Sequence, residues 1–166
     1  RETAVEAAPA GGSTASAPPI LRIREVTKVF GSGPDATVAL RDVSLDVAAG
    51  EFLTIVGASG CGKSTLLNLI AGLDKPSSGS VEVAGNVAFM FQDATLLPWL
   101  TARQNVELAL KLRGVPGRER RDRAQELLAT VQLDGRGDAR PHELSGGMRH
   151  RVALARCLAQ DAQVVL

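Results

Sequence analysis

The stretch GASGCGKS, residues 57–64, has the residue types and the spacing needed to hold a phosphate group. It fits the pattern GxxxxGK[ST], in which glycines let successive backbone N–H groups point at one anion. A helix that follows such a loop places its positive N-terminus on the same anion. Lys63 adds a charge that can reach the terminal phosphates of a nucleotide, and the Ser64 hydroxyl can ligate Mg²⁺. The predicted phosphate-binding residues are Gly57, Ala58, Ser59, Gly60, Cys61, Gly62, Lys63, Ser64 and Thr65.

A second helix start of the same kind lies downstream, at Leu144-Ser145-Gly146-Gly147-Met148. Ser145 is a suitable N-cap, and the glycine pair leaves backbone N–H groups accessible to an anion. One small domain rarely needs two such helix ends for one nucleotide. If two copies of the chain face each other, the second helix end of one copy can close over the terminal phosphate held by the other. The alternative is an ordinary capped helix with a glycine hinge.

The segments around the first loop read as strands and a helix. LRIREVTKVF (21–30) alternates apolar and polar residues, which indicates a half-buried strand, and VALRDVSLDV (38–47) repeats the pattern. The solid apolar run FLTIV (52–56) predicts a parallel strand covered on both faces, which leads directly into the phosphate loop. STLLNLIAGL (64–73) predicts the helix that follows, and SVEV and NVAFMF predict further strands.

From Thr101 the hydrophobic period becomes helical, with Thr101 as N-cap. A second amphipathic helix follows, then the helix that starts at the glycine pair, and DAQVVL (161–166) reads as a buried strand. This order predicts an α/β core with an inserted helical lobe at about residues 98–144. We expect residues 1–19, rich in Ala, Pro and Gly, to form a disordered tail and residues 20–166 to form the nucleotide-binding domain.

The composition excludes several classes of protein. The net charge is +1, so no strong field draws the chain to nucleic acid or to an anionic membrane. The charged run at residues 118–123 mixes both signs without aromatic residues, which is typical of a solvated helix face. Cys61 and Cys157 indicate a reducing cytosol rather than a disulfide framework, and the cysteines and histidines lack the spacing of a zinc site. There is no apolar run of membrane-spanning length and no secretory leader.

The phosphate loop, FQD at 91–93 and LSGGMRHR at 144–151 together resemble the nucleotide-binding subunit of an ABC transporter, in that family's order. The resemblance implies a P-loop NTPase fold of the ABC type, an α/β core with an antiparallel β subdomain and an inserted helical lobe. It implies ATP and Mg²⁺ as cofactors, with Phe30 stacking on adenine. It also implies that Gln92 contacts Mg²⁺ and the attacking water, and that Ser145, Gly146 and Gly147 bind the nucleotide of a partner copy. From the residues alone, Phe30 also suits strand packing and Gln92 the cap of a strand end.

The residues after Gln92 narrow the resemblance. LLPW at 96–99, followed by Thr101 and Asn105, is similar to the importer ATPases for nitrate, sulfonates and taurine. This implies ATP hydrolysis that drives uptake of such an anion, with Lys63 and Gln92 as the catalytic residues. It implies a head-to-tail second copy, membrane permease subunits, indirectly a solute-binding protein, no nucleic acid, and a place on the cytoplasmic face of the bacterial inner membrane. LLPW can present an apolar knob to a membrane subunit, although Trp99 can also fill the core of the lobe.

In the family, the strand after the LSGGM helix ends in Asp-Glu, which hold Mg²⁺ through water and polarise the attacking water. DAQVVL aligns with that strand, so we expect a chain that is truncated before these acids and binds ATP without appreciable hydrolysis. His150 stands where the family usually has Gln. Two other hypotheses stay open, a non-transport ABC ATPase that acts on nucleic acid or the ribosome, and a nucleotide-binding module without turnover. A GTPase or kinase would leave LSGGM unexplained.

Overall fold

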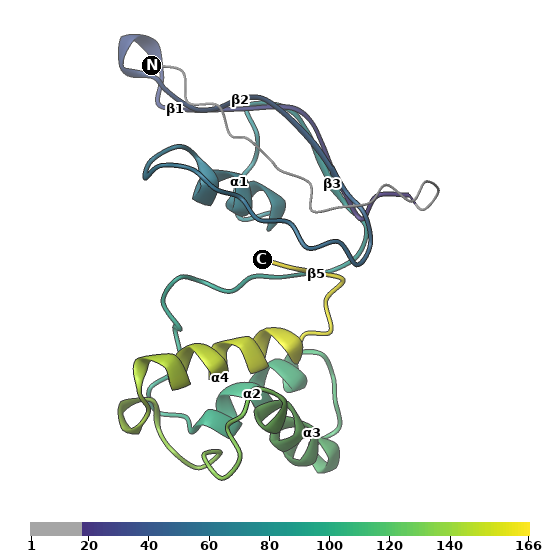
Figure 1. Cartoon of the computed structure of the whole chain (residues 1–166), viewed down its shortest axis with the longest axis vertical. Coiled ribbons are helices and arrows are strands. Elements are labelled where there is room, and N and C mark those ends of the chain that lie inside the picture. Colours follow the sequence, from purple (N-terminus) through teal and green to yellow (C-terminus); the bar gives the residue numbers. More distant parts are fainter. Residues whose placement is uncertain (1–17) are drawn as a thin grey trace. The chain divides into compact units, whose positions relative to one another are not determined.

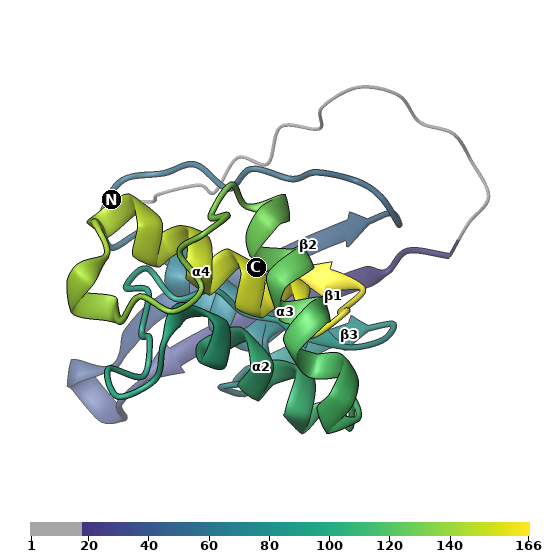
Figure 2. The same cartoon turned by 90° about the horizontal axis from the view of Figure 1, so that it is seen from below.

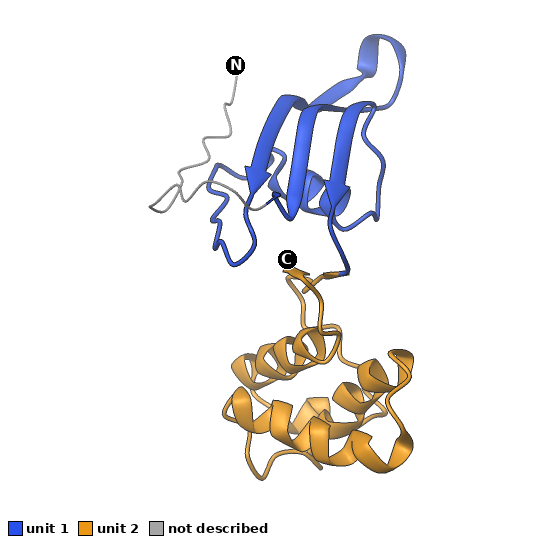
Figure 3. Cartoon of the chain, turned by 90° about the vertical axis from the view of Figure 1, so that its right-hand side faces the viewer, with its two compact units in different colours: residues 1–86 blue, residues 87–166 orange. Residues whose placement is uncertain are grey.

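The computed structural model describes residues 18–166, so the predicted tail lies outside the described residues except at its last two positions. The chain divides into two compact units, which meet in the sequence between Asn86 and Val87 (Figure 3). None of the helices in the described part of the chain combines the length and the apolar character that crossing a bilayer requires.

The first unit is built on an antiparallel sheet with the order β2-β1-β3, whose strands lie side by side in Figure 3. The strands are β1 (Leu21–Phe30), β2 (Thr37–Val47) and β3 (Ser78–Val83). In β1 the core-facing residues are Leu21 and Ile23, and a shift of register then places Val26 on the buried face. The two alternating segments are therefore strands as predicted, and the antiparallel β subdomain is confirmed.

Helix α1 (Lys63–Ile70) lies against this sheet in Figure 1. Leu66, Leu69 and Ile70 are its buried residues, and their spacing forms one apolar stripe along the helix. The predicted helix after the phosphate loop is confirmed, and it ends before Ala71. Its packing on the sheet fixes the direction in which its N-terminus points.

The prediction of a buried parallel strand at residues 52–56 is wrong. Only an isolated bridge forms there, at Ile55, and Phe52 is 83% exposed. A strand that is buried on both faces needs neighbouring strands for its backbone and helices over both faces. Within residues 18–166, no neighbouring strand forms a ladder of hydrogen bonds with this segment. The phosphate loop is therefore preceded by extended and largely exposed chain.

In the second unit, β4 (Val87–Ala88) pairs in parallel with β5 (Val164–Val165). Two further hydrogen bonds lengthen the pairing, from Leu166 N to the Ala88 carbonyl at 2.9 Å and from Met90 N to the Leu166 carbonyl at 2.7 Å. DAQVVL thus contains a strand, as predicted. Its predicted burial is wrong, since Val165 is 49% exposed in this two-stranded sheet.

Three helices of the second unit share one apolar core and group together in Figure 2. They are α2 (Ala102–Leu112), α3 (Gly117–Thr130) and α4 (Gly146–Leu158). Thr101 caps α2 as predicted, because its hydroxyl accepts from Gln104 N while the Gln104 side chain accepts from Thr101 N. The helix that begins at the glycine pair belongs to the same core as the segment 98–144. The core residues are Ala102, Val106, Ala109, Leu110, Ala124, Leu128, Val131, Leu133, Leu144, Val152, Ala155 and Ala159.

Candidate functional site

The phosphate loop enters α1 through Gly62, which is the N-cap of the helix and has a left-handed backbone, with φ of 98°. A Cβ atom at this position would lie 2.5 Å from the Ala39 carbonyl oxygen and 2.8 Å from Leu40 Cδ2. Both the conformation and the close approach therefore require glycine. No side chain caps the helix, and the first N–H groups of a helix have no acceptor within it. These donors can serve an anion.

The ammonium group of Lys63 lies over its own loop. Lys63 Nζ donates to the carbonyls of Gly57 at 2.8 Å and Ala58 at 2.7 Å, and it lies 3.5 Å from Cys61 Sγ. These contacts hold a positive charge beside the backbone N–H groups of the loop. Ser64, the next residue of α1, is exposed. The loop thus gathers a cation, a hydroxyl and a helix N-terminus within one short segment.

Phe30 closes β1 and pairs with Thr37 of β2. Its side chain is 45% exposed, so the ring does not serve as a buried packing residue of the strand. The ammonium of Lys28 lies over the ring, 4.9 Å from its centroid. The first unit therefore carries both the predicted phosphate loop and an accessible aromatic ring.

The second predicted helix start is formed with Ser145 as its cap, as expected. Ser145 caps α4, and its hydroxyl accepts a hydrogen bond from Met148 N at 3.3 Å. Gly146 and Gly147 open the helix in exposed positions. Leu144 is buried just before the cap and Met148 packs against the helical core, so the helix start is anchored on both sides of the glycine pair.

The segment that carries Gln92 runs along α4 and is fastened to it by two side chains. His150 bonds through Nε2 to the Gln92 carbonyl and through Nδ1 to the Gly146 carbonyl, each at 2.9 Å. Because both ring nitrogens face backbone carbonyls, the pKa of His150 is raised. Arg156 donates to the carbonyls of residues 94 and 95. No local sequence pattern could have shown the contact of His150 with Gln92, which lies 58 residues before it in the chain.

The loop that contains LLPW is held by Asn105. Asn105 is fully buried in α2; its Oδ1 accepts from Leu97 N at 2.9 Å, and its Nδ2 donates to the Thr101 carbonyl at 2.9 Å. Leu96 packs against the helical core, whereas Trp99 is 66% exposed. Trp99 therefore does not fill the core of the lobe. An amide on the apolar face of a predicted helix was the signal that could have revealed this anchor.

The structure groups the predicted site residues in two sets. Phe30 and residues 57–65 belong to the first unit, and Gln92 and residues 145–147 belong to the second. Within residues 18–166 no group of three His, Cys, Asp or Glu side chains is placed to hold a metal. The hydroxyl of Ser64 in the first unit is a hard oxygen donor of the kind that Mg²⁺ accepts alongside water and phosphate oxygens, and so is the amide oxygen of Gln92 in the second unit.

Comparisons with known proteins show which family the chain resembles. The sequence matches the profile of the ABC transporter family over residues 40–166. It is 52% identical over 136 residues to the taurine import ATP-binding protein of Mesorhizobium japonicum, a match that covers 77% of this chain and 53% of that protein. It is 40% identical over 164 residues to the lipoprotein-releasing system ATP-binding protein of Chromohalobacter salexigens, covering 89% of this chain and 69% of that protein. The chain thus spans only part of the length of the relatives it matches.

Solved structures of ATP-binding cassettes also match this chain. The dimeric structure of a post-hydrolysis state of an ATP-binding cassette bound to ADP and Pi matches this chain with a TM-score of 0.80 and 37% sequence identity. The match covers 87% of this chain and 72% of that chain. The family profile, the relatives and the fold agree with the order of the phosphate loop and the LSGGM helix start, and the chain therefore belongs to the ABC transporter family, among its ATP-binding subunits.

Proposed function

We propose that the chain supplies the ATP-binding part of an ABC importer, a complex in which ATP hydrolysis drives uptake of a small anion such as nitrate, an aliphatic sulfonate or taurine, and that the 166-residue chain by itself binds ATP without appreciable hydrolysis. The observation that carries the proposal is the phosphate loop, in which Gly62 begins a helix that has no side-chain cap and Lys63 holds a charge over the loop. The resemblance of LLPW and the taurine-importing relative favour the importer subfamily.

Each predicted site residue has a role in this function. The N–H groups of residues 57–65 and the Lys63 ammonium would hold the ATP phosphates, and Phe30 would stack on adenine. Ser64 would supply a ligand to Mg²⁺, and so would Gln92, and the ion would neutralise charge on the phosphate oxygens. Residues 145–147 would close over the terminal phosphate held by a second, head-to-tail copy.

The remaining parts of the proposal concern partners and place. The exposed Trp99, on a loop fixed by the buried Asn105, offers an apolar contact for a membrane permease subunit. The protein would then lie on the cytoplasmic face of the bacterial inner membrane, with a solute-binding protein on the other side delivering the anion. No nucleic-acid contact is part of this function.

The first test is a titration of the purified chain with ATP in the presence of Mg²⁺, measured by isothermal titration calorimetry. We expect saturable binding that Lys63→Ala weakens about 100-fold, since a charge-assisted contact to phosphate is lost. Lys111→Ala, which removes a lysine from the last turn of α2, is the matched control and should bind as the parent does. Absence of binding by the parent chain would refute the proposal.

The second test uses the protein with its permease subunits in vesicles. ATP-dependent uptake of nitrate, taurine or an alkanesulfonate would support the importer. RNA-stimulated or DNA-stimulated ATP turnover without transport would instead favour a non-transport ATPase. Tight MgATP binding with neither activity would favour a nucleotide-binding module.

A further inference from the structure

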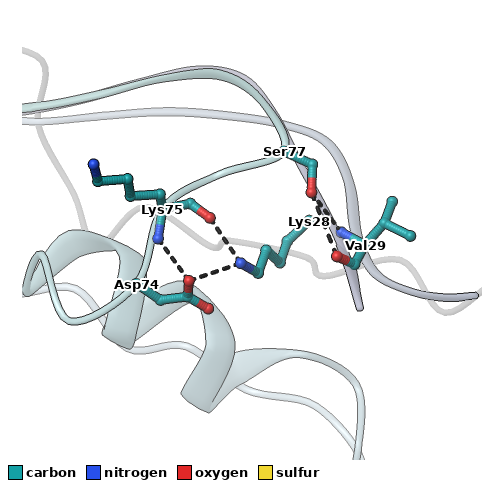
Figure 4. Close-up of polar contacts among 5 residues, drawn as sticks. All are labelled: Lys28, Val29, Asp74, Lys75 and Ser77. Carbon is teal, nitrogen blue, oxygen red and sulfur yellow. Dashed lines mark hydrogen bonds and ion pairs between the residues drawn. The ribbon is translucent and has the colours of Figure 1, made fainter. Parts of the chain in front are cut away.

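The end of β1 and the turn after α1 are joined by a small network of polar contacts, drawn in Figure 4. Lys28 Nζ donates to Asp74 Oδ1 at 2.7 Å and to the Lys75 carbonyl at 2.8 Å. Asp74 Oδ1 also accepts from Lys75 N, and Ser77 Oγ accepts from Val29 N at 3.0 Å. The Lys28 side chain is only 12% exposed. Its ammonium group is therefore fixed in place and does not sample solvent freely.

The same ammonium group lies 4.9 Å from the centre of the Phe30 ring. This distance is within the range of about 6 Å over which a cation is attracted to an aromatic face. This attraction favours the ring orientation in which the aromatic face is turned to the ammonium group. Lys28 thus determines where an exposed ring is presented.

Both ends of α1 are tied to the strand end that carries Phe30. At its N-terminus, Gly62 packs directly against the Ala39 carbonyl and Leu40, and Leu40 is the residue paired with Lys28 across the β1–β2 ladder. Beyond its C-terminus, the chain reaches Asp74, which binds Lys28. The phosphate loop and the aromatic ring are therefore linked through one short helix and one ion pair.

We propose that Lys28 is a positioning residue of the nucleotide site: anchored by Asp74 and the Lys75 carbonyl, it holds the Phe30 ring where the base stacks. This inference rests on the proposed function, because it assumes that the loop binds the phosphates of a nucleotide. It predicts a contribution to the affinity for a ligand with a base and none for a ligand that consists of phosphates alone.

The test measures the dissociation constants of the whole 166-residue chain for MgATP and for inorganic tripolyphosphate with Mg²⁺. Lys28→Met keeps much of the length of the side chain and removes its charge. We expect it to weaken MgATP binding about threefold to tenfold and to change tripolyphosphate binding by less than about twofold. Asp74→Asn should act in the same direction with a smaller effect, and Lys28→Arg should recover most of the ATP affinity.

Arg24→Met is the matched control. Arg24 lies on the same strand and forms its own, more exposed ion pair with Asp46 at 2.6 Å, so its loss removes an ion pair of the sheet that does not contact the Phe30 ring. We expect both dissociation constants to stay at the parent values. A loss of ATP affinity in Arg24→Met as large as that in Lys28→Met would overturn the inference, because any ion pair of the sheet would then suffice.

A double-mutant cycle with Phe30→Leu separates positioning from general stability. In the Phe30→Leu background, Lys28→Met should cause no further loss of ATP affinity, because there is no ring left to position. Additive losses, unchanged ATP affinity in Lys28→Met, or equal losses for ATP and tripolyphosphate would each contradict the inference while leaving the phosphate loop intact as a binding site. Failure of the parent chain to bind either ligand would refute the proposed function itself.

Discussion

The helix that begins at Lys63 and the helix that begins at Gly146 have glycine-containing starts, yet they are capped differently. Gly62 caps α1 with a left-handed backbone and no side-chain hydrogen bond. Ser145 caps α4 with its hydroxyl, which already accepts from Met148 N. The first start leaves its N–H groups to a ligand and adds the charge of Lys63. At the second start, the Ser145 hydroxyl already accepts from one of the N–H groups of the first turn.

The two units also differ in how they are stabilised. The three helices of the second unit share one continuous apolar core. In the first unit, the chain that leads into the phosphate loop, residues 52–56, is largely exposed. The loop is therefore held by close backbone packing at Gly62 and by the contacts of Lys63, whereas the LSGGM helix start is held by a buried core. Substitutions that affect one mode of support should leave the other unit intact.

Gly62→Ala should give the largest effect. The new Cβ would lie 2.5 Å from the Ala39 carbonyl in a left-handed conformation, so we expect a loss of about 3 kcal/mol in the free energy of unfolding of the first unit. Gly147→Ala tests the other helix start, where a Cβ meets nothing within 4 Å. That variant should be stabilised by about 0.5–1 kcal/mol, because alanine suits the first turn of a helix better than glycine. Denaturant unfolding curves measure the free energy of unfolding of both variants. A similar destabilisation in the two would show that the two helix starts do not differ in their need for glycine.

Asn105→Ala should give the second largest effect on stability. It leaves Leu97 N without its acceptor and removes the Nδ2 hydrogen bonds to the carbonyls of residues 100 and 101, and we expect a loss of about 2 kcal/mol in the stability of the helical unit. Chemical denaturation followed by circular dichroism measures the loss. Lys111→Ala on the same helix should stay within about 0.5 kcal/mol of the parent. If both variants unfold alike, the buried amide does not anchor the LLPW loop.

His150→Ala should loosen the segment that carries Gln92 without unfolding the helical core. The contact between His150 and the Gln92 carbonyl is lost, while Arg156 still binds residues 94 and 95. Amide hydrogen exchange of residues 92–95 should therefore become faster, and His150→Gln should restore part of the protection. His142→Ala, at another exposed histidine, is the control. Unchanged exchange in His150→Ala would show that Arg156 alone holds the segment.

The smallest effect concerns acid pH. Hydrogen bonds from Lys28 and from Lys75 N lower the pKa of Asp74. A carboxyl whose pKa is lower in the folded state than in the unfolded chain stabilises the fold above the unfolded value, and this stabilisation is lost as the pH falls through the folded value. We therefore expect the first unit to lose stability slightly below about pH 4, and Asp74→Asn to flatten that part of the profile. Thermal unfolding measured between pH 3 and pH 6 checks both curves, and identical slopes would count against the ion pair.

Local pattern predicted much of the molecule. The alternation of 21–30, the helix after the phosphate loop, the Thr101 cap and the Ser145 cap each depend on neighbours within a few residues, and each forms as expected. The burial predicted for the segments 52–56 and 161–166 is wrong because an apolar run indicates only a tendency to be buried. Whether burial occurs depends on which other strands and helices pack against the run.

The amino-acid sequence by itself determined the family, the phosphate loop and the second helix start, because glycine, lysine and serine at fixed spacing act through local backbone geometry. Only the tertiary structure decided that Lys28 holds the Phe30 ring through Asp74, that His150 binds the Gln92 carbonyl, and that Asn105 anchors an exposed Trp99. These contacts join residues far apart in the chain. Their partners are set by the register of the sheet and the packing of the helices, and no short sequence pattern encodes either of these.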